Sequence, residues 1–185
     1  MKLRIKNTET IFPMPVLLIS TFNEDGSVDV MNAAWGTMLK NDMLALNLDE
    51  GHKTVDNIKE RGGFVMHIAD AEHVKEADWF GVVSAKDVSD KFEKTGMSFV
   101  KSKLVDAPII NELPLAVECE FIEYQGGEMG VGVIAKVLGT SVEESKLKDG
   151  KIDIDSLEAI AFDPYTNGYY RVCGRVGDAF SDGLK

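Results

Sequence analysis

The chain has 185 residues, a hydrophobic share of 44% and a formal net charge of −11. This length is enough for one buried core, so we expect residues 1–185 to form a single domain. The acidic balance argues against a nucleic-acid partner, and no apolar run is long enough to cross a bilayer. The N-terminal residues MKLRIKNTET lack a long apolar segment, so we expect no signal peptide and a cytoplasmic location.

The first part of the chain predicts a β-hairpin and a third strand. PVLLIST (Pro15–Thr21) is a short apolar run, and VDVMNA (Val28–Ala33) alternates after the turn residues NEDGS. Met43–Asp49 predicts the third strand, because leucines alternate there with alanine and asparagine.

A helix and a fourth strand are predicted next. We expect Thr54 to be the N-cap, Val55 and Ile58 to share one helix face, and Gly62 to end the helix. FVMHIA (Phe64–Ala69) then predicts a strand.

The middle of the chain predicts two short helices, at 72–81 and 86–96, followed by a loop that contains Pro108. Lys91 and Lys94 lie in the second of these helices, and we expect both to be solvated.

The last predicted strands are Leu115–Tyr124 and Gly130–Val142, paired through a glycine turn. In the first of them Val117, Cys119 and Phe121 share one face. The aromatic and glycine-rich tail, residues 161–180, predicts no regular element. Roughly seven strands in hairpins, with no glycine-rich nucleotide motif after any of them, favour a mainly antiparallel β-barrel with a few short helices.

The cysteines and histidines do not suggest a metal site. Cys119 and Cys173 have no CxxC neighbour, and we expect both to be buried thiols. The three histidines lack metal-ligand spacing, and His67 is expected in the barrel interior because it lies in an apolar strand.

Residues Gly51–Asn57, GHKTVDN, are the first candidate for ligand binding. They join a strand to a helix, where unpaired N–H groups and the helix dipole favour an anion. His52, Lys53 and Thr54 add further donors in an otherwise acidic chain. The alternative, a capped surface helix with a solvated lysine, stays open.

Residues Asn32–Trp35 are the second candidate. Small side chains allow a flat ligand to lie against the backbone, and Trp35 can stack on it or shield it from water. The alternative is that Trp35 is a core or interface aromatic. Together the two segments suit a phosphorylated aromatic cofactor.

Six segments, taken in their order along the chain, carry a resemblance to a known family: PMPVLLIST, DGSVDVMNAAWGTM, LDEGHKTVDNIKERGGFVMHIA, EADWFGVVSAKDVSDKFEKTG, VDAPIINELPLAVECEF and YYRVCGRVGDAF. With these segments the sequence resembles the flavoredoxin and flavin reductase-like family. The resemblance runs from about Phe12 to Phe180. It implies a split antiparallel β-barrel of the FMN-binding type, with FMN as cofactor. It also implies that the protein forms homodimers. Tyr169, Tyr170 and Phe180 are candidates for the contact between subunits, and the alternative is that the tail packs on its own chain.

The resemblance also implies which residues contact the cofactor. Those expected along the isoalloxazine and ribityl chain are Ser20, Thr21, Met31, Asn32, Ala33, Ala34 and Trp35, and those at the strand end that borders the flavin are Asn47 and Leu48. Those expected at the phosphate are His52, Lys53, Thr54 and Asn57, and those in a loop near the flavin are Ser84 and Lys86. No residue is assigned a catalytic role.

The activity implied is NAD(P)H-dependent flavin oxidoreduction, with NADH or NADPH as co-substrate and free flavin or a redox partner protein as acceptor. Two departures bear on it. Asp49 and Glu50 stand where many flavoredoxins have basic residues, so the phosphate charge would fall to Lys53, the helix start and His52. Many flavin reductases also have a His-Thr pair where this chain reads GEMGVGV, which leaves a flavoredoxin-type electron carrier as the alternative. A module that uses the barrel for another ligand is a third possibility.

Overall fold

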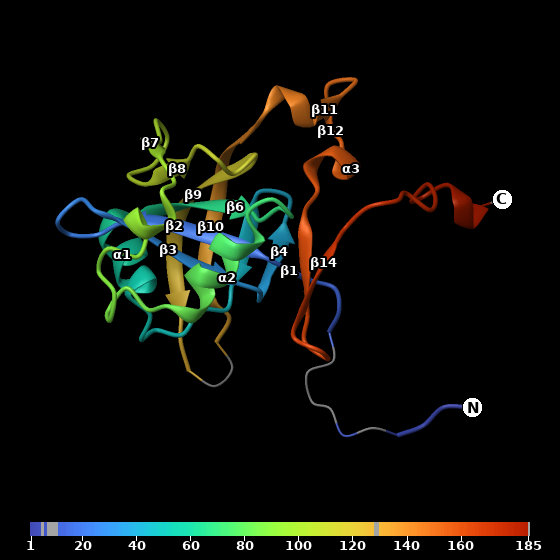
Figure 1. Ribbon diagram of the computed structural model, residues 1–185, viewed down its shortest axis with the longest axis horizontal. Helices are drawn as coiled ribbons and strands as arrows, with labels where there is room; N and C mark the ends of the chain where they lie inside the picture. Colours follow the sequence, from blue (N-terminus) through green and yellow to red (C-terminus); the bar gives the residue numbers. More distant parts are fainter. Residues whose placement is uncertain (5, 7–10, 128–129, 185) are drawn as a thin grey trace.

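A seven-stranded antiparallel sheet organises the computed structural model, which describes residues 1–4, 6, 11–127 and 130–184 (Figure 1). The strand order is β3-β2-β6-β9-β10-β5-β4. The strands are β2 (Leu17–Phe22), β3 (Val28–Ala33), β4 (Gly36–Lys40), β5 (Met43–Leu46), β6 (Gly63–Ile68), β9 (Leu115–Gln125) and β10 (Gly132–Val142).

The two ends of this sheet are consecutive in the chain, since β3 and β4 are linked only by Ala34 and Trp35. So short a link forces the sheet to curl until its ends meet. β3 and β4 do not pair with each other, so the barrel is split between them. The predicted split β-barrel fold is therefore confirmed.

Buried side chains lie on both faces of the central strands. In β2 every residue is buried, and alternate residues enter different cores because side chains alternate along a strand. Leu18 packs with Val30, Phe80 and other residues in one core. Ile19 packs in the barrel interior, where Cys119, together with Val117 and Phe121, lies on the face that we predicted.

Helix α1 (Lys53–Arg61) covers one side of the barrel, with Val55 and Ile58 fully buried. It ends as predicted at Gly62, which adopts the left-handed conformation with φ of 71°. The predicted N-cap was wrong. His52 occupies that position, and Thr54 is the second residue of the helix, with its hydroxyl donating to Asp29 and not capping the first turn.

Helix α2 (Val74–Val82) matches the predicted helix at 72–81, but the helix predicted at 86–96 was wrong. Only the 3-10 turn η1 (Glu93–Thr95), which ends at Gly96, is regular there. Lys91 and Phe92 are adjacent and both buried, whereas adjacent residues of a surface helix point in different directions. This segment follows the surface of the barrel instead of its own helical period.

The other differences from prediction concern short strands. The third strand ends at Leu46, and β4 was missed because its residues are mostly exposed and lack a buried face. The expected loop around Pro108 contains the hairpin of β7 (Phe99–Lys101) and β8 (Pro108–Ile110). The predicted β9–β10 pairing is confirmed, and residues 128 and 129, which follow the expected turn at 125–127, lie outside the described residues.

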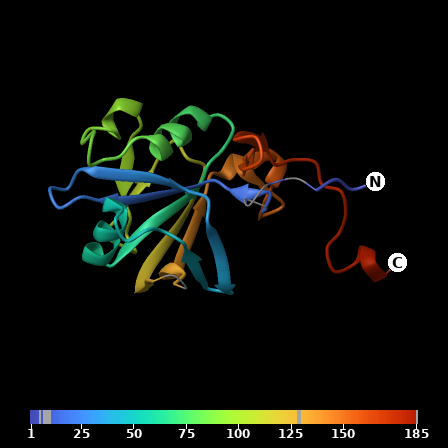
Figure 2. The same cartoon turned by 90° about the horizontal axis from the view of Figure 1, so that it is seen from below.

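The tail contains a hairpin that we did not predict. β13 (Ile160–Asp163) pairs with β14 (Gly168–Arg171) and with β1 (Met14–Pro15). Minor elements precede and follow it: η2 (Glu144–Lys146), β11 (Leu147–Lys148), β12 (Lys151–Ile152), α3 (Ile154–Leu157) and η3 (Asp182–Leu184). Both chain ends extend away from the barrel on the same side, in two perpendicular views (Figures 1 and 2).

The two cysteines differ in environment. Cys119 is buried as predicted, and this burial raises the pKa of its thiol to about 12. The prediction that Cys173 is buried was wrong, because the tail beyond β14 leaves the body. Among the described residues, no helix combines the length and apolar character that a membrane crossing needs.

Candidate functional site

A pocket of about 410 Å³ opens at the split of the barrel, and we call it the split pocket. This volume lies in the range of roughly 300–1,000 Å³ that small-molecule sites occupy. Its walls are β3 and the link to β4, the residues after β5, the start of α1, and the segment after α2. The lining residues are Asp29, Met31, Asn32, Ala34, Trp35, Asn47, Leu48, His52, Lys53, Thr54, Phe80, Gly81, Val82, Val83, Ser84, Ala85 and Lys91.

The structure brings most of the predicted site residues together in this pocket. Those that line it are Met31, Asn32, Ala34, Trp35, Asn47, Leu48, His52, Lys53, Thr54 and Ser84. The two segments singled out by their sequence, one rich in small residues and one at a helix start, therefore face the same cavity.

Four predicted residues lie in the protein interior instead. The amide nitrogen of Asn57 donates to Thr21 Oγ1 and to Asn23 Oδ1, at 3.0 Å each. The Ser20 hydroxyl donates to the carbonyl oxygen of Pro108 at 2.7 Å. Ala33 is buried in the barrel core. None of these four lines the split pocket, and the polar ones tie α1 and β2 to their neighbours from within.

Lys86 also stands outside the lining but bridges two of the pocket walls. Its Nζ donates to the carbonyl oxygen of Gly51 at 2.6 Å, which joins the segment after α2 to the residues before α1. Its backbone N–H donates to Ser84 Oγ at 3.1 Å. The contact with Gly51 holds the segment after α2 against the residues before α1, and the contact with Ser84 stabilises a turn within the segment.

The start of α1 is the end of the pocket that suits an anion. The first N–H groups of α1 that find an acceptor belong to Val55 and Asp56, and both donate to the His52 carbonyl. Among the described residues, the N–H groups of Lys53 and Thr54 have no hydrogen-bond acceptor. They point along the positive end of the helix dipole, beside the Lys53 side chain.

The Thr54 side chain is oriented differently from what its position suggests. Its hydroxyl donates to Asp29 Oδ2 at 2.6 Å, so its proton points into the body. A ligand at the helix start would find the backbone N–H of Thr54 and oxygen lone pairs, but not the hydroxyl proton.

The opposite wall is formed by small residues and an open tryptophan. Trp35 is 61% exposed, so one side of its ring faces outward. The Asn32 amide donates to the Ala77 carbonyl at 2.9 Å, which fixes this side chain against α2. A Cβ on Gly36 would lie 2.6 Å from Leu17 Cδ1 and 2.9 Å from Leu46 Cδ2, so a larger residue there would require these leucine side chains to shift.

Asp29 and Lys91 line the pocket although the sequence did not indicate them. They are 1% and 3% exposed and form an ion pair with Oδ1 and Nζ 3.4 Å apart. The prediction that Lys91 is solvated was wrong, whereas Lys94 is exposed as expected. For Asp29 there was one signal, a carboxylate in an otherwise apolar hairpin strand. For Lys91 the local sequence offered none.

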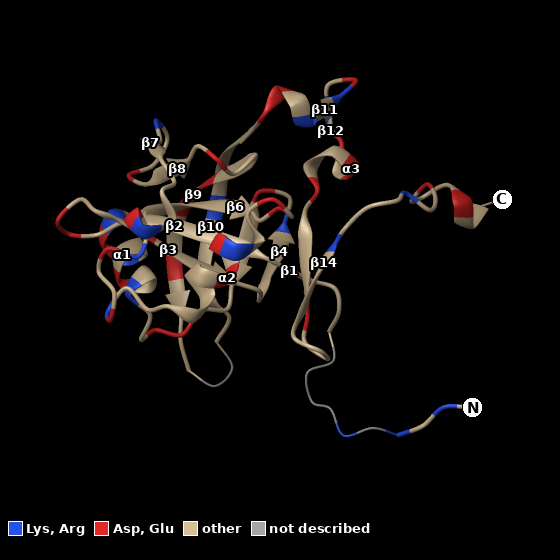
Figure 3. Ribbon diagram, viewed as in Figure 1, with Lys and Arg blue, Asp and Glu red and all other residues tan. Residues whose placement is uncertain are grey.

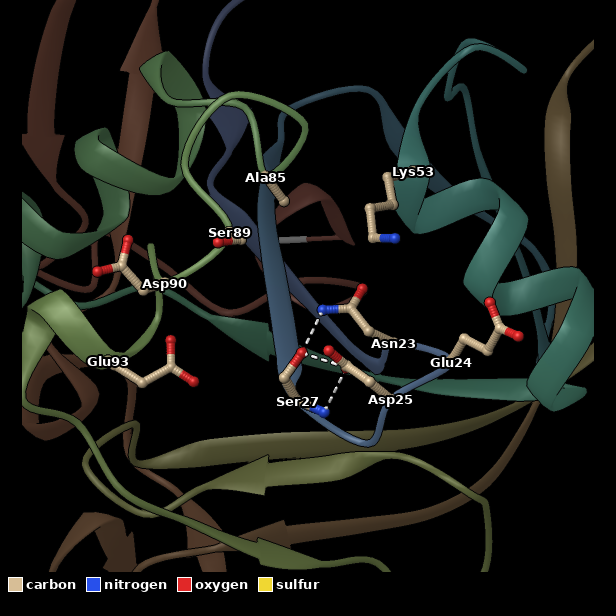
Figure 4. Close-up of a pocket in the computed structure, with 9 residues that line it drawn as sticks. All are labelled: Asn23, Glu24, Asp25, Ser27, Lys53, Ala85, Ser89, Asp90 and Glu93. Carbon is tan, nitrogen blue, oxygen red and sulfur yellow. Dashed lines mark hydrogen bonds between the residues drawn. The ribbon is translucent and has the colours of Figure 1, made fainter.

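A second depression, the acidic hollow, lies on the other side of Lys53 and measures about 610 Å³ (Figure 4). Its lining residues are Asn23, Glu24, Asp25, Ser27, Lys53, Ala85, Ser89, Asp90 and Glu93. Hydrogen bonds from Ser27 lower the pKa of Asp25 below its usual value, with a smaller contribution from Lys53. Figure 3 shows acidic and basic residues together around α1 and its neighbouring loops.

The comparisons with known proteins agree with this geometry. Residues 9–162 match the family model described as "Flavin reductase like domain", so the chain belongs to the flavin reductase-like family. A flavoredoxin of Desulfovibrio vulgaris (Miyazaki F) is 31% identical with a TM-score of 0.91, covering 99% of this chain and 100% of that one.

Other relatives are either uncharacterized or less similar in sequence. An uncharacterized protein of Archaeoglobus fulgidus is 33% identical over 153 residues, which is 80% of this chain and 82% of that protein. With two other curated relatives the match spans 43% and 61% of their length. An FMN-binding domain of a flavin reductases-like enzyme from Shewanella baltica, 20% identical, shares the fold with a TM-score of 0.76, covering 89% and 88% of the two chains.

Proposed function

We propose that this protein binds FMN in the split pocket and acts as a flavin oxidoreductase, passing hydride or electrons from NADH or NADPH to an acceptor. One observation carries the proposal. A single pocket joins a helix start with a lysine to a wall of small residues, in a chain of the flavin reductase-like family. A phosphorylated aromatic cofactor needs both ends.

The residues of the pocket divide according to the part of the cofactor they suit. The phosphate would bind the free N–H groups of Lys53 and Thr54, with the Lys53 ammonium and His52 beside it. The ring would lie along the backbone of Met31–Trp35 and Asn47–Leu48. Ser20, Thr21, Ala33 and Asn57 support these walls from the interior, while Ser84 and Lys86 hold the segment above them.

Bound FMN would supply a ring that accepts and releases hydride or electrons. The chain itself would position that ring, limit access of water and leave one face open to a reactant. Backbone groups of β3, an edge strand of the sheet, would bond the ring edge, and Trp35 would limit approach from its side.

Absorbance spectroscopy tests the cofactor directly. Purified protein, supplied with FMN and then freed of unbound ligand, should retain visible flavin absorbance, and mass spectrometry of the released ligand should show FMN. A protein that stays colourless after this treatment contradicts the proposal.

A flavoredoxin-type electron carrier is the second candidate. The match to the Desulfovibrio flavoredoxin covers 99% of this chain and 100% of that chain, and the sequence has no histidine in residues 130–134. Gly132, at this point, has a φ of +80°, and a Cβ there would lie 2.3 Å from the Leu46 carbonyl oxygen. Gly132 itself therefore presents no side chain to a nicotinamide.

Anaerobic mixing of the FMN-loaded protein with NADH and with NADPH separates the two candidates. Rapid bleaching of the bound flavin by either nucleotide supports the oxidoreductase. Bleaching only by a stronger chemical reductant such as dithionite supports the carrier, whose acceptor or donor would be a redox partner protein instead of free flavin.

We also infer a homodimer. Trp35 and Met38, beside the pocket, are exposed apolar residues, and so are Tyr170 and Phe180 of the tail. Tyr169 differs, since it packs on its own chain and its hydroxyl donates to Asp78 at 2.9 Å. Light scattering coupled to size-exclusion chromatography should report twice the chain mass, and a monomer at micromolar concentration contradicts the inference.

A further inference from the structure

The ion pair of Asp29 and Lys91 is unusual in position as well as burial. The two side chains come from distant parts of the chain, from β3 and from the segment after α2, and both line the split pocket. Buried charges need compensation by partners, so the contacts of each atom decide what the pair can do.

Lys91 is held from several sides. Its Nζ lies 3.4 Å from Asp29 Oδ1 and donates to the Val83 carbonyl at 3.3 Å. Its own carbonyl accepts a hydrogen bond from Trp79 Nε1 at 3.0 Å. These contacts fix the lysine and, with it, the segment that covers the pocket.

Asp29 is less completely satisfied. Its Oδ2 accepts the short hydrogen bond from Thr54, at 2.6 Å. Its Oδ1 is buried and accepts no hydrogen bond from any described residue, although the Lys91 ammonium lies nearby. A buried carboxylate oxygen without a donor is costly, and it is a strong acceptor for a ligand group that brings one.

The position of Asp29 indicates which ligand group that is. Through Thr54 it lies next to the start of α1, where the phosphate is proposed to bind. Along β3 it lies two residues before Met31, where the wall for the ring begins. Between the ring and the phosphate of FMN runs a chain of carbons that carry hydroxyl groups, and hydroxyls donate well to a carboxylate.

We propose that Asp29 accepts a hydrogen bond from a hydroxyl of the ribityl chain, and that Lys91 positions Asp29 for this contact. The inference rests on the proposed function, because it takes FMN as the ligand. A phosphate is a poor occupant of this point, since the carboxylate would repel it. Riboflavin and FMN should use Asp29 equally, because they share the ribityl chain.

The test removes both charges at once, so that no single charge is left buried. The variant Asp29→Leu with Lys91→Met keeps the approximate volumes and leaves an apolar pair, which proteins tolerate well. The matched control is Asp90→Leu with Lys94→Met, an exposed ion pair of 2.8 Å in the same segment. Circular dichroism and thermal unfolding report whether each variant is folded.

Binding is measured by flavin fluorescence with FMN, with riboflavin and with lumiflavin, which has the ring but no ribityl chain. We expect the Asp29–Lys91 variant to bind FMN and riboflavin about 10- to 100-fold more weakly, by the same factor, with lumiflavin binding unchanged. The control should bind all three like the wild type. Undiminished riboflavin binding, or an equal loss for lumiflavin, overturns the proposal.

A crystal structure of the wild-type protein with FMN gives a second, independent answer. A ribityl oxygen within about 3.2 Å of Asp29 Oδ1 supports the contact, and a ribityl chain that runs elsewhere overturns it. A wild-type protein that binds no flavin contradicts the proposed function itself. Wild-type binding that the double variant leaves intact contradicts only the role of Asp29.

Discussion

The split pocket and the acidic hollow share Lys53 and Ala85 but are built in different ways. The split pocket has its charged pair, Asp29 and Lys91, buried in the wall. The acidic hollow has exposed carboxylates, such as Glu24 and Glu93, around an opening into which Lys53 points (Figure 4). Buried charges act at full strength over short distances, whereas exposed charges are screened by water and salt. From this difference we expect the split pocket to determine which ligand binds and the hollow to change only the affinity.

The largest expected effect is on stability and comes from the pocket wall. Lys91→Met leaves the Asp29 carboxylate buried without its counter-charge, which should lower the free energy of unfolding by about 3–5 kcal/mol. Lys94→Met, in the exposed pair of the same segment, should change it by less than about 1 kcal/mol. Urea unfolding measures the free energy of unfolding of both variants. Equal losses would show that the buried ion pair contributes no more to stability than the exposed one.

The next effect is a pH dependence at His67, which is buried on the outer face of β6 with its ring beside Ser20 and the Ile110 N–H of β8. Burial lowers the pKa of His67 from 6.5 to about 3, so between these values the unfolded chain binds a proton that the folded protein does not. Stability should therefore fall as the pH decreases through this window, by about 2.5 kcal/mol between pH 7 and pH 4.5.

Urea unfolding of the wild type and of His67→Leu at both pH values isolates this contribution, since carboxylates titrate in both proteins. The loss on acidification should be smaller in the variant by about 2.5 kcal/mol. A variant that loses as much stability as the wild type would show that His67 does not titrate as its burial predicts.

The third effect concerns the lysine that the two regions share. Lys53→Ala should weaken FMN binding by about 1.5–3 kcal/mol, because it removes a charged contact to the phosphate, and should leave riboflavin binding unchanged. Lys59→Ala is the matched control, since Lys59 lies on the same helix but pairs with Glu50. Fluorescence titration measures the affinities, and equal losses for FMN and riboflavin would place the phosphate elsewhere.

Thr54 is left out of this variant because its hydroxyl donates to Asp29 and not toward the helix start. Replacing it would disturb the pocket wall together with the phosphate end, so the two effects could not be separated.

The smallest effect is expected in the acidic hollow. Glu24→Gln with Glu93→Gln removes two negative charges beside Lys53 and keeps the hydrogen bonds between Asp25 and Ser27. FMN affinity should rise by about two- to fivefold at low salt and not at 1 M salt, where the screening length is about 3 Å. A gain that persists at high salt would mean that these carboxylates contact the ligand directly.

Local sequence patterns predicted the elements whose own residues determine them. Alternation and a turn identified the β2–β3 hairpin, and two buried positions with a final glycine identified α1. The prediction failed at β4 and in the segment after α2. The exposed residues of β4 show no alternation of buried positions, and Lys91 is buried through a partner sixty-two positions earlier in the chain.

The same division applies to the site. The sequence by itself determined that a run of small residues and a helix start with a lysine exist, because both are local features. Only the tertiary structure decided that they face one pocket, since curling of the sheet brings β3, β5 and α1 together at the split. It also decided that Asn57 and Thr21 bond each other inside the protein, and that a buried carboxylate lies between the two ends of the pocket. Contacts between residues far apart in the chain depend on the packing of whole elements, and no local pattern records them.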